Sequence, residues 1–583
     1  MRRLVLLVIV AALAAVGILY GLRHAAGTTP TAVTGLLPRG TIFLAHVPDF
    51  KRARDQWHES DIYQLYREPA VQDFLQRPLA RAPQRDTASQ TLGEIEQLDP
   101  KEAFLAVTSI ENNNPRFAGG FRFRGNRDDA ERIVGKWRAQ FVKNDSTRES
   151  MDYERHKIDI VGAAPNQIAT VYDGDWFFAS NDLAELKTLL DRVDGRVLAT
   201  ASPSGGGKDR QLTLDADENF RAAMAHMPAS YALLFYLQPK GFSEKLASLQ
   251  TAIGQPATSS GIEQIRSICG TTRFDKGKLH DVLFVGMPKI AQDANLKRSS
   301  AALGTADTFF YLAALLNPEK FDSLSQAGGI GALGAWLQKF FQATSRSGTT
   351  ADDWRAAFEL ELGSLADWPA NARWPSLIAT IPVKDSAHAN KIVNMLTSAI
   401  DEDAPWTKTE KDGVRYFFMA TPASLFAITP TIALSDHMMV AGLDSVSVEA
   451  AMKRNRSELG RRSAASGLSN SEAYKTAAHS VPAPTHLFAY IDTALLYSRL
   501  DAALRPMLLM SAAFMPAISD YVNVGKLPEP KVVTRHLSPI VSSQRYDGDG
   551  YVAESVGPVT LNQAAIGIGW PAIFWAIGHP HKR

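Results

Sequence analysis

MPASYALLFY, at residues 227–236, recurs in altered form as VPAPTHLFAY at residues 481–490. Both stretches place a proline second and a tyrosine last, and both end in an apolar run that is typical of a buried strand. A stretch that returns in this way indicates an internal duplication, which changes how the whole chain is divided. The fold therefore depends on whether other segments recur in the same order.

Two further pairs of segments do recur in that order. TIFLA at residues 41–45 resembles TFFYL at 308–312, and RFD at 273–275 resembles RYD at 545–547. Turn residues and a β-rich run follow RFD and RYD alike. The partners are separated by roughly 250–270 residues throughout, which predicts two tandem copies of one module.

Between these markers, each half has the same order of elements: a strand, a helix, several strands and a second helix. In the first half, strands are expected at residues 117–124, 153–161, 168–172 and 176–179, and helices after the candidate N-caps Asn126 or Asp128 and Asn181 or Asp182. In the second half, strands are expected at 377–381, 414–420, 426–432 and 438–441, and helices from the cap Ser386 and over 446–452. This order predicts an α+β fold, with antiparallel strands in one layer and helices in the other.

The domain boundaries follow from the duplication. Copy 1 is expected at residues 38–292 and copy 2 at residues 300–560, with the polar segment between them as the junction. Residues 1–24 are predicted to be an N-terminal anchor, 25–37 a short flexible stalk, and 561–583 an apolar tail. The predicted architecture is an N-terminal transmembrane helix followed by two antiparallel-sheet-plus-helices modules.

The N-terminal segment has the length of a membrane-spanning helix. Residues 4–22 carry no charge, and an α-helix needs ~20 apolar residues to cross the hydrocarbon core. Arg2 and Arg3 favour a cytoplasmic N-terminus, which predicts a single-pass protein of the bacterial inner membrane with its ectodomain in the periplasm. A signal peptide cleaved near the alanine-rich residues 11–15 is the alternative, although the apolar run continues past them.

The C-terminal tail is a second candidate for contact with a membrane. Residues 555–578 are uncharged, and the chain then ends in the basic sequence HPHKR. The basic end favours a second crossing, whereas several glycines and prolines leave the run short and weakly apolar. We expect a docked or interfacial segment, with a second membrane span as the alternative.

Composition and charge exclude several classes of partner and site. The 583 residues are 45% hydrophobic with a formal net charge of +1, which is ordinary for a globular protein and lacks the basic field that nucleic acids require. Cys269 is the single cysteine, so the chain has no intramolecular disulfide. The isoleucines before Cys269 have helical spacing and Gly270 can stop a helix, so a buried structural cysteine on a helix is expected.

The sequence motifs that resemble ligand sites lack the context that those sites need. GIGALG at residues 329–334 follows a helical pattern, whereas a dinucleotide fingerprint follows a strand. SGGGKD at 204–209 lacks the spacing of a phosphate loop, and DGDG at 547–550 lacks the ligands of a calcium loop and is expected to be a hairpin turn. We predict no catalytic, cofactor-binding or metal-binding residues, and no cofactor.

The thirteen histidines form no recognised metal or protease motif. His46 near Asp49, and His58 beside Glu59, are candidate acid–base pairs, with surface or turn positions as the simpler interpretation. Asp215, Asp217 and Asn219 fit a helix entry better than a metal loop.

The stretch LLPRGTIFLAHVPD, at residues 36–49, resembles the start of a known family. It is similar to the LPxxT-type start, after the anchor, of an uncharacterised bacterial membrane-anchored envelope protein family, classed as a domain of unknown function. The agreement is specific over this stretch and looser over residues 545–557. The resemblance implies an anchor before a long α+β ectodomain, and it implies no activity and no site residues.

Two functions remain open at this point. The favoured hypothesis is a non-catalytic structural or binding protein, a scaffold of the cell envelope, with the membrane and other envelope proteins as its partners. The alternative is an extracytoplasmic hydrolase or ligand receptor with its site between the two copies. No motif supports an enzyme.

Overall fold

The computed structural model describes residues 31–563, with gaps at 81–93, 95–96, 112–113, 142–147, 163–166, 197–212, 240–263, 290–293, 322–341, 343, 401–405, 420–428, 460–466 and 515–522. The chain divides into two compact units. Unit 1 comprises Met1–Pro288, Ala517–Leu527 and Asp547–Arg583, and unit 2 comprises Lys289–Pro516 and Pro528–Tyr546. Both units include segments from late in the chain, and the boundaries predicted for the two copies stay a prediction.

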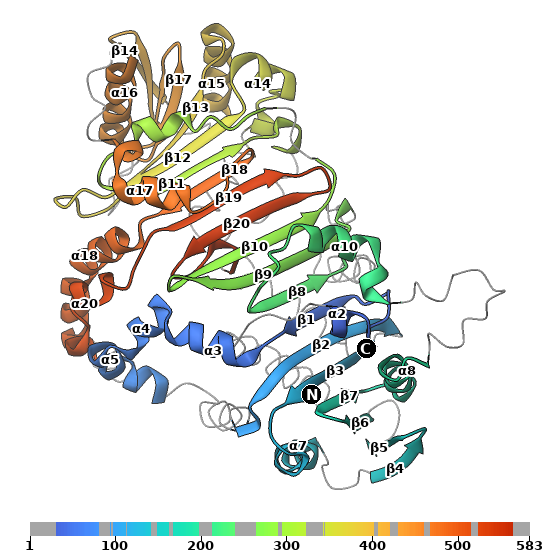
Figure 1. Ribbon diagram of the computed structural model, residues 1–583. Helices are drawn as coiled ribbons and strands as arrows, with labels where there is room; N and C mark the ends of the chain where they lie inside the picture. The colour runs from blue at the N-terminus through green and yellow to red at the C-terminus, as the bar shows by residue number, and fades with distance from the viewer. Residues whose placement is uncertain are drawn as a thin grey trace. The chain divides into compact units, whose positions relative to one another are not determined.

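Unit 1 contains an antiparallel sheet of eleven strands (Figure 1). The strand order is β4-β5-β6-β7-β3-β2-β1-β8-β9-β10-β20. The strands are β1 Phe43–Val47, β2 Pro100–Glu111, β3 Asn114–Phe123, β4 Arg148–Tyr153, β5 His156–Val161, β6 Ile168–Asp173, β7 Trp176–Ser180, β8 Leu233–Leu237, β9 Ser267–Asp275, β10 Lys278–Gly286 and β20 Tyr551–Gly557.

Unit 2 contains an antiparallel sheet of nine strands. The strand order is β14-β15-β16-β17-β13-β12-β11-β18-β19. The strands are β11 Thr308–Leu315, β12 Glu361–Asp367, β13 Ser376–Pro382, β14 Trp406–Lys411, β15 Val414–Met419, β16 Thr431–Leu434, β17 Met438–Gly442, β18 Leu487–Ile491 and β19 Ile540–Tyr546.

These nine strands repeat the order of the first nine strands of unit 1. The register repeats as well, because Leu44 of β1 lies opposite Ala106 and Tyr236, and Tyr311 of β11 lies opposite Leu365 and Tyr490. Tyr236 and Tyr490 are the last residues of the two stretches whose likeness first indicated a duplication. The two units can therefore be compared position by position.

Helices pack on both faces of the unit 1 sheet. Helix α7 contributes Ala130 and Ile133 to a cluster with Phe123 of β3, whereas helix α8 contributes Leu186 and Leu190 to the main core. The sequence predicted helices in one layer, so this detail was wrong. The helices of unit 1 are α2 Thr31–Thr34, α3 Phe50–His58, α4 Asp61–Arg67, α5 Pro69–Ala80, α7 Arg127–Phe141, α8 Leu183–Val193, η2 Leu214–Ala216, α10 Glu218–Ala225 and η8 Val524–Lys526.

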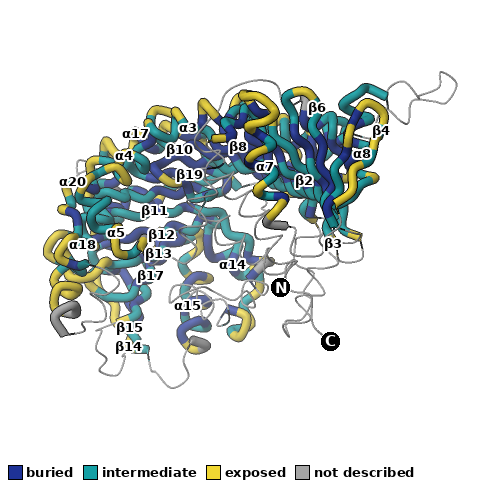
Figure 2. The backbone as a smooth tube through the Cα atoms, turned by 90° about the horizontal axis from the view of Figure 1, so that it is seen from below, coloured by how far each residue is buried: buried dark blue, intermediate teal, exposed yellow. Residues whose placement is uncertain are grey.

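Unit 2 has a core of its own, in which Ile392 and Leu396 of helix α15 pack with Phe417 of β15. The central strands of both units, such as β8 and β18, are largely buried (Figure 2). The helices of unit 2 are η5 Ser299–Leu303, η6 Pro318–Lys320, α14 Ala351–Ala357, α15 Ser386–Ile400, α16 Ser445–Leu459, η7 Leu468–Asn470, α17 Glu472–His479, α18 Thr493–Phe514 and α20 Pro530–Thr534.

Most elements expected between the repeat markers are confirmed. The strand expected at 117–124 is β3, and the run expected at 153–161 contains the turn of a hairpin between β4 and β5. Asn126 accepts a hydrogen bond from the backbone of Asp129, and Asp182 caps helix α8. Both caps arise because a short carboxylate or amide side chain satisfies a free N–H of the first turn.

Two local predictions were wrong. Cys269 is buried as expected, but it lies on strand β9 and not on a helix, because the strand pairs on both sides with β8 and β10. Ser386 is the first residue of α15, and the cap is Asp385, whose Oδ1 accepts from the backbone of His388 at 2.8 Å. The spacing of residues alone does not distinguish a strand from a helix at Cys269, or the cap Asp385 from its neighbour Ser386, since tertiary pairing decides them.

The predicted membrane architecture is corrected. In the described part of the chain, no helix combines the length and the apolar character that a bilayer crossing requires. The longest of those helices, α18, carries Arg499, Asp501 and Arg505 along its length. The predicted span at residues 4–22 and the tail from residue 564 onward lie outside the described residues. The fold is thus given by two sheet units, and the single-pass inner-membrane assignment finds no support and is not retained.

Candidate functional site

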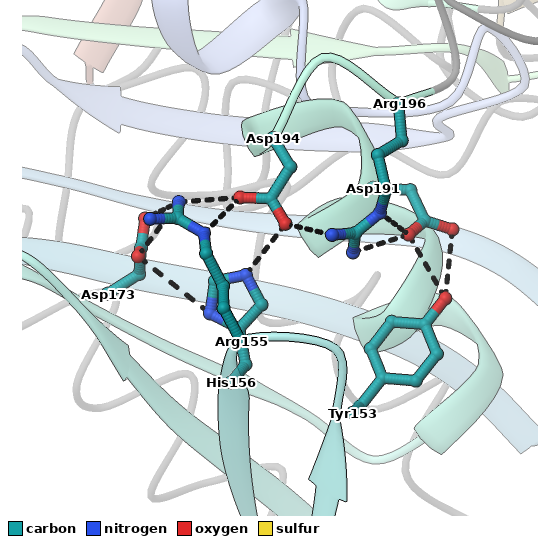
Figure 3. A network of polar contacts seen from close by, with 7 residues as sticks. All are labelled: Tyr153, Arg155, His156, Asp173, Asp191, Asp194 and Arg196. Carbon is teal, nitrogen blue, oxygen red and sulfur yellow. Dashed lines mark hydrogen bonds and ion pairs between the residues drawn. The ribbon is translucent and has the colours of Figure 1, made fainter.

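A dense network of polar contacts in unit 1 lies where the β4–β5 hairpin meets the end of helix α8. Seven side chains from three segments take part, and we call them the hairpin cluster (Figure 3): Tyr153, Arg155, His156, Asp173, Asp191, Asp194 and Arg196. Glu154 in the turn has a φ of 52°, so the two strands reverse within two residues. The reversal places Tyr153 and His156 opposite each other, at the end of the hairpin.

His156 is the centre of the hairpin cluster. Its side chain is 2% exposed, its Nε2 lies 2.9 Å from Oδ2 of Asp194, and its Nδ1 lies 3.8 Å from Oδ1 of Asp173. Both ring nitrogens therefore face carboxylates. A histidine that acts as a base needs one nitrogen directed at a substrate, and in this arrangement neither nitrogen is available for one.

Asp194 is bound by two arginines as well as by His156. Arg155 donates to its Oδ1 at 2.7 Å from Nε, and Arg196 donates to its Oδ2. Burial alone would raise the pKa of Asp194, but the hydrogen bonds from Arg155 and His156 outweigh burial and hold the pKa below its usual value. Asp194 is therefore an anchor for the hairpin that stays ionised at neutral pH.

Tyr153 closes the other end of the cluster. Its hydroxyl donates to both oxygens of Asp191, at 3.0 and 3.1 Å, and Arg196 binds the same carboxylate at 2.7 Å. Burial and the hydrogen bond to Asp191 raise the pKa of the tyrosine. The hydroxyl therefore stays a donor at neutral pH. The cluster joins the hairpin to the helix both through this hydrogen bond from a neutral tyrosine and through ion pairs.

Unit 2 shows that the fold does not need these charges. Lys411 and Val414 flank the β14–β15 turn as Tyr153 and His156 flank the β4–β5 turn. Val414 is buried like His156, so an apolar side chain replaces the imidazole at the same position. At this position the described part of unit 2 thus lacks the imidazole around which the hairpin cluster is built. Sequence reasoning missed the cluster, because its members come from residues 153–156, 173 and 191–196.

Two further buried histidines of unit 1 are bound in the same way at both nitrogens. His46 lies 2.9 Å from Glu102 through Nε2 and 3.3 Å from the hydroxyl of Tyr231 through Nδ1. The partner expected for His46, Asp49, instead caps helix α3. The simpler interpretation of His46, a surface position, was also wrong, because the side chain is 1% exposed. In the other candidate pair, His58 packs its ring on Tyr63.

His280 is bound at both ring nitrogens by side chains of the neighbouring strands. Nη2 of Arg273 lies 3.0 Å from its Nδ1, and Oε2 of Glu554 lies 3.2 Å from its Nε2. A guanidinium can only donate, so Nδ1 must be the acceptor and Nε2 must carry the hydrogen that Glu554 receives. His280 is consequently a fixed bridge between strands β9, β10 and β20.

The predicted motifs fall into two groups. Residues 204–209 and 329–334 lie outside the described residues. The DGDG stretch is a turn, in which the N–H of Asp547 donates to Gly550 at 2.9 Å, and Asp217 caps helix α10. Within the described ranges, no three or more histidine, cysteine, aspartate or glutamate side chains gather closely enough to hold a metal ion.

Comparisons with known proteins give no family. No family model matches the sequence, and no curated protein matches it. Among solved structures, crystal form I of TP0453 is 8% identical over 46% of this chain and 82% of its own, with a TM-score of 0.23. Crystal form III of TP0453 is 7% identical over 46% and 83%, again with a TM-score of 0.23. Likeness at this level carries no argument about fold or function.

Asp281 is a buried carboxylate that sequence reasoning also missed. It lies on β10, where the hydroxyl of Thr560 donates to Oδ2 and the amide of Gln563 donates to Oδ1 at 3.4 Å. Burial raises the pKa of Asp281 to about 6, against the hydrogen bonds from Thr560 and Thr272, which favour the ionised form. A single aspartate within an apolar strand was the one available signal.

The Asp281→Asn variant should remove a pH dependence of stability. The unfolded chain releases the proton near pH 4, whereas folded unit 1 keeps it to about pH 6. The proton therefore stabilises unit 1 at low pH, and this stability is lost as the pH rises through 6. We expect the free energy of unfolding of the wild type, relative to Asp281→Asn, to fall by roughly 2 kcal/mol between pH 4 and 7. Urea unfolding of both proteins at several pH values measures this difference in the free energy of unfolding. A difference that stays constant with pH would contradict the prediction.

Proposed function

We propose that this chain is a non-catalytic binding protein, or scaffold, that holds a protein partner through the end of helix α18. The proposal is carried by the position of the exposed apolar side chains. Large apolar side chains are exposed at nine described positions, and five of these lie on α18, at Leu500 and Met507–Met510. Contiguous apolar surface of this kind marks interaction sites, whereas single exposed apolar residues are ordinary.

The first half of α18 is fixed to unit 2. Arg499 donates to the carbonyl of Trp368 at 2.8 Å and to the carboxylate of Asp307 at 2.8 Å. Arg505 binds Asp501 one turn earlier and also donates to the carbonyl of Pro528. These bonds hold the helix in place as far as Arg505, and Pro506 and the residues after it continue from that fixed part.

The turn of α18 formed by residues 507–510 is apolar on every side. Met507, Leu508, Leu509 and Met510 are successive residues, about 100° apart around the helix axis, and they are 37%, 40%, 49% and 59% exposed. A helix that lay on a flat surface would need one apolar face only. Apolar character all round therefore favours a partner that encloses the helix end, as a deep groove in a protein does.

The bound histidines support a non-catalytic role. Each of His46, His156 and His280 has both nitrogens directed at protein groups. None of them is left with a nitrogen for a substrate, which favours binding over acid–base chemistry.

A photo-crosslinking amino acid at Leu509 tests the proposal. In cells that produce the full chain, we expect one dominant protein adduct, which is lost when Leu508 is replaced by glutamate. The same probe at Val446, an isolated apolar residue that is 76% exposed, is the matched control and should give no adduct. The purified partner should then bind the wild type at least tenfold more tightly than Leu508→Glu, because a buried, unpaired charge costs more than 1.4 kcal/mol. Equal adducts at both positions, or adducts with lipid alone, would refute a protein partner for α18.

A further inference from the structure

Strands β4 and β14 each form one edge of the sheet in their unit. Each is paired with one neighbour in the described part of its sheet, β4 with β5 and β14 with β15 (Figure 1). Four of the six residues of β4 and five of the six residues of β14 are exposed. An edge strand offers a row of N–H and C=O groups to which another strand can add.

The hairpin geometry decides which groups point outward. Residues that flank a two-residue turn form a hydrogen-bonded pair, and the pairs then alternate along the ladder. Tyr153 pairs with His156 in this way, so the main-chain groups of Arg148, Ser150 and Asp152 point away from β5. Lys411 pairs with Val414, and by the same rule Trp406, Lys408 and Glu410 point away from β15.

The two edges carry opposite net charge. Strand β4 has one base and two acids, Arg148, Glu149 and Asp152, so its net charge is −1. Strand β14 has two bases and one acid, Lys408, Lys411 and Glu410, so its net charge is +1. When two molecules approach, a β4 edge is therefore attracted to a β14 edge, whereas two β4 edges or two β14 edges repel each other.

One antiparallel register satisfies both the outward bonds and the charges. If Ser150 lies opposite Glu410, the outward-pointing N–H and C=O groups of β4 face those of β14. Side chains that lie opposite each other are then on the same face of the joined sheet. Glu149 then lies opposite Lys411, and Asp152 lies opposite Lys408. No like charges face each other, and opposite charges that face each other across a ladder stabilise the pairing. Lys411 is 59% exposed and only 3.6 Å from Glu449 within its own unit, so its ammonium can reach a second carboxylate.

We propose that β4 of one molecule pairs with β14 of a second copy of this chain, in the register that places Ser150 opposite Glu410. The interface joins two different surfaces, so each molecule keeps one edge of each kind, and assembly continues until a ring closes or a filament forms. This inference does not depend on the role proposed for α18.

Charge exchange tests the pairing. In sedimentation velocity of the full chain at low salt, the wild type should associate with increasing concentration, and a salt concentration of about 0.5 M should weaken the association. Glu149→Lys and Lys411→Glu should each weaken it by about fivefold, because one attraction becomes a repulsion. The double variant should restore it, since the lysine introduced on β4 of one molecule then faces the glutamate introduced on β14 of its neighbour. A double variant no better than the single ones would overturn the register.

Blocked edges test the head-to-tail arrangement. Proline removes an outward N–H, so Ser150→Pro disables β4 and Glu410→Pro disables β14. Neither variant should associate alone, and an equal mixture should form a one-to-one dimer through the two intact edges. Thermal unfolding of each variant verifies that it is folded. Self-association of either variant, a mixture that remains monomeric, or a wild type that is monomeric at every concentration would overturn the proposal.

Discussion

Replacing Glu361 by alanine is expected to destabilise unit 2 by about 3 to 5 kcal/mol. Glu361 is 3% exposed, and its carboxylate accepts hydrogen bonds from the backbone N–H groups of Lys297, Arg298 and Ser299 at 2.6, 2.9 and 2.7 Å. The hydroxyl of Ser299 donates to it at 3.0 Å as well. Alanine leaves three converging N–H groups without their acceptor beside a buried site, and an unmade bond of this kind costs roughly 1–3 kcal/mol.

Glu359→Ala is the matched control, two residues away on the same segment. Its carboxylate is 41% exposed and binds the exposed ammonium of Lys297, so the expected loss is below about 1 kcal/mol. Urea unfolding gives both values, and hydrogen exchange at Lys297–Ser299 reports the local effect. If Glu361→Ala exchanged at these amides no faster than Glu359→Ala, the three N–H groups would not depend on the carboxylate.

Asp194→Ala is expected to destabilise unit 1 by about 3 kcal/mol, since it removes one partner of a buried pair. His156 would lose the acceptor of its Nε2 at a position where its side chain is only 2% exposed. Arg155 and Arg196 reach solvent, at 60% and 32% exposed, so water replaces much of what they lose. The expected loss therefore lies at the low end for a broken buried pair.

His156→Val should cost less than about 1 kcal/mol, because an apolar replacement leaves Asp194 with both arginines. Unit 2 already has a valine, Val414, at this position. The two variants also differ in their response to acid. The pKa of Asp194 is lowered in the folded state, so its contribution is present above about pH 4 and is lost as the pH falls through the lowered value. Urea unfolding of both variants gives the comparison, and a loss after His156→Val as large as that after Asp194→Ala would show that the imidazole itself holds the hairpin.

Periodicity in the sequence predicted most strands and helices between the repeat markers, because each element is set by local spacing and by a nearby cap. Asp182 and Asn126 are such cases. The environment of Cys269 was not predictable in this way, since the pairing of β9 on both sides decides it. The buried charges were missed for a related reason: Glu361 meets donors more than sixty residues earlier in the chain.

The carboxylate of Glu361 has a counterpart in unit 1. Glu102 lies four residues before Ala106, as Glu361 lies four residues before Leu365, and these are the residues opposite Leu44 and Tyr311. The donors differ, because His46 binds Glu102, whereas Ala313 stands at that position in unit 2.

Gly363 explains how backbone N–H groups can bind Glu361 in unit 2, where no histidine takes the place of His46. A Cβ at Gly363 would lie 2.1 Å from Oγ of Ser300, so the glycine lets helix η5 and its backbone donors approach the sheet. Phe104 occupies the matching position in unit 1. The two units thus keep the same acid with unrelated donors. Loss of the acid alone leaves its donors without an acceptor, and loss of the donors alone leaves the acid without hydrogen bonds. Substitution of either acid is therefore expected to destabilise its own unit, and the groups left without an acceptor are a histidine in unit 1 and backbone N–H groups in unit 2.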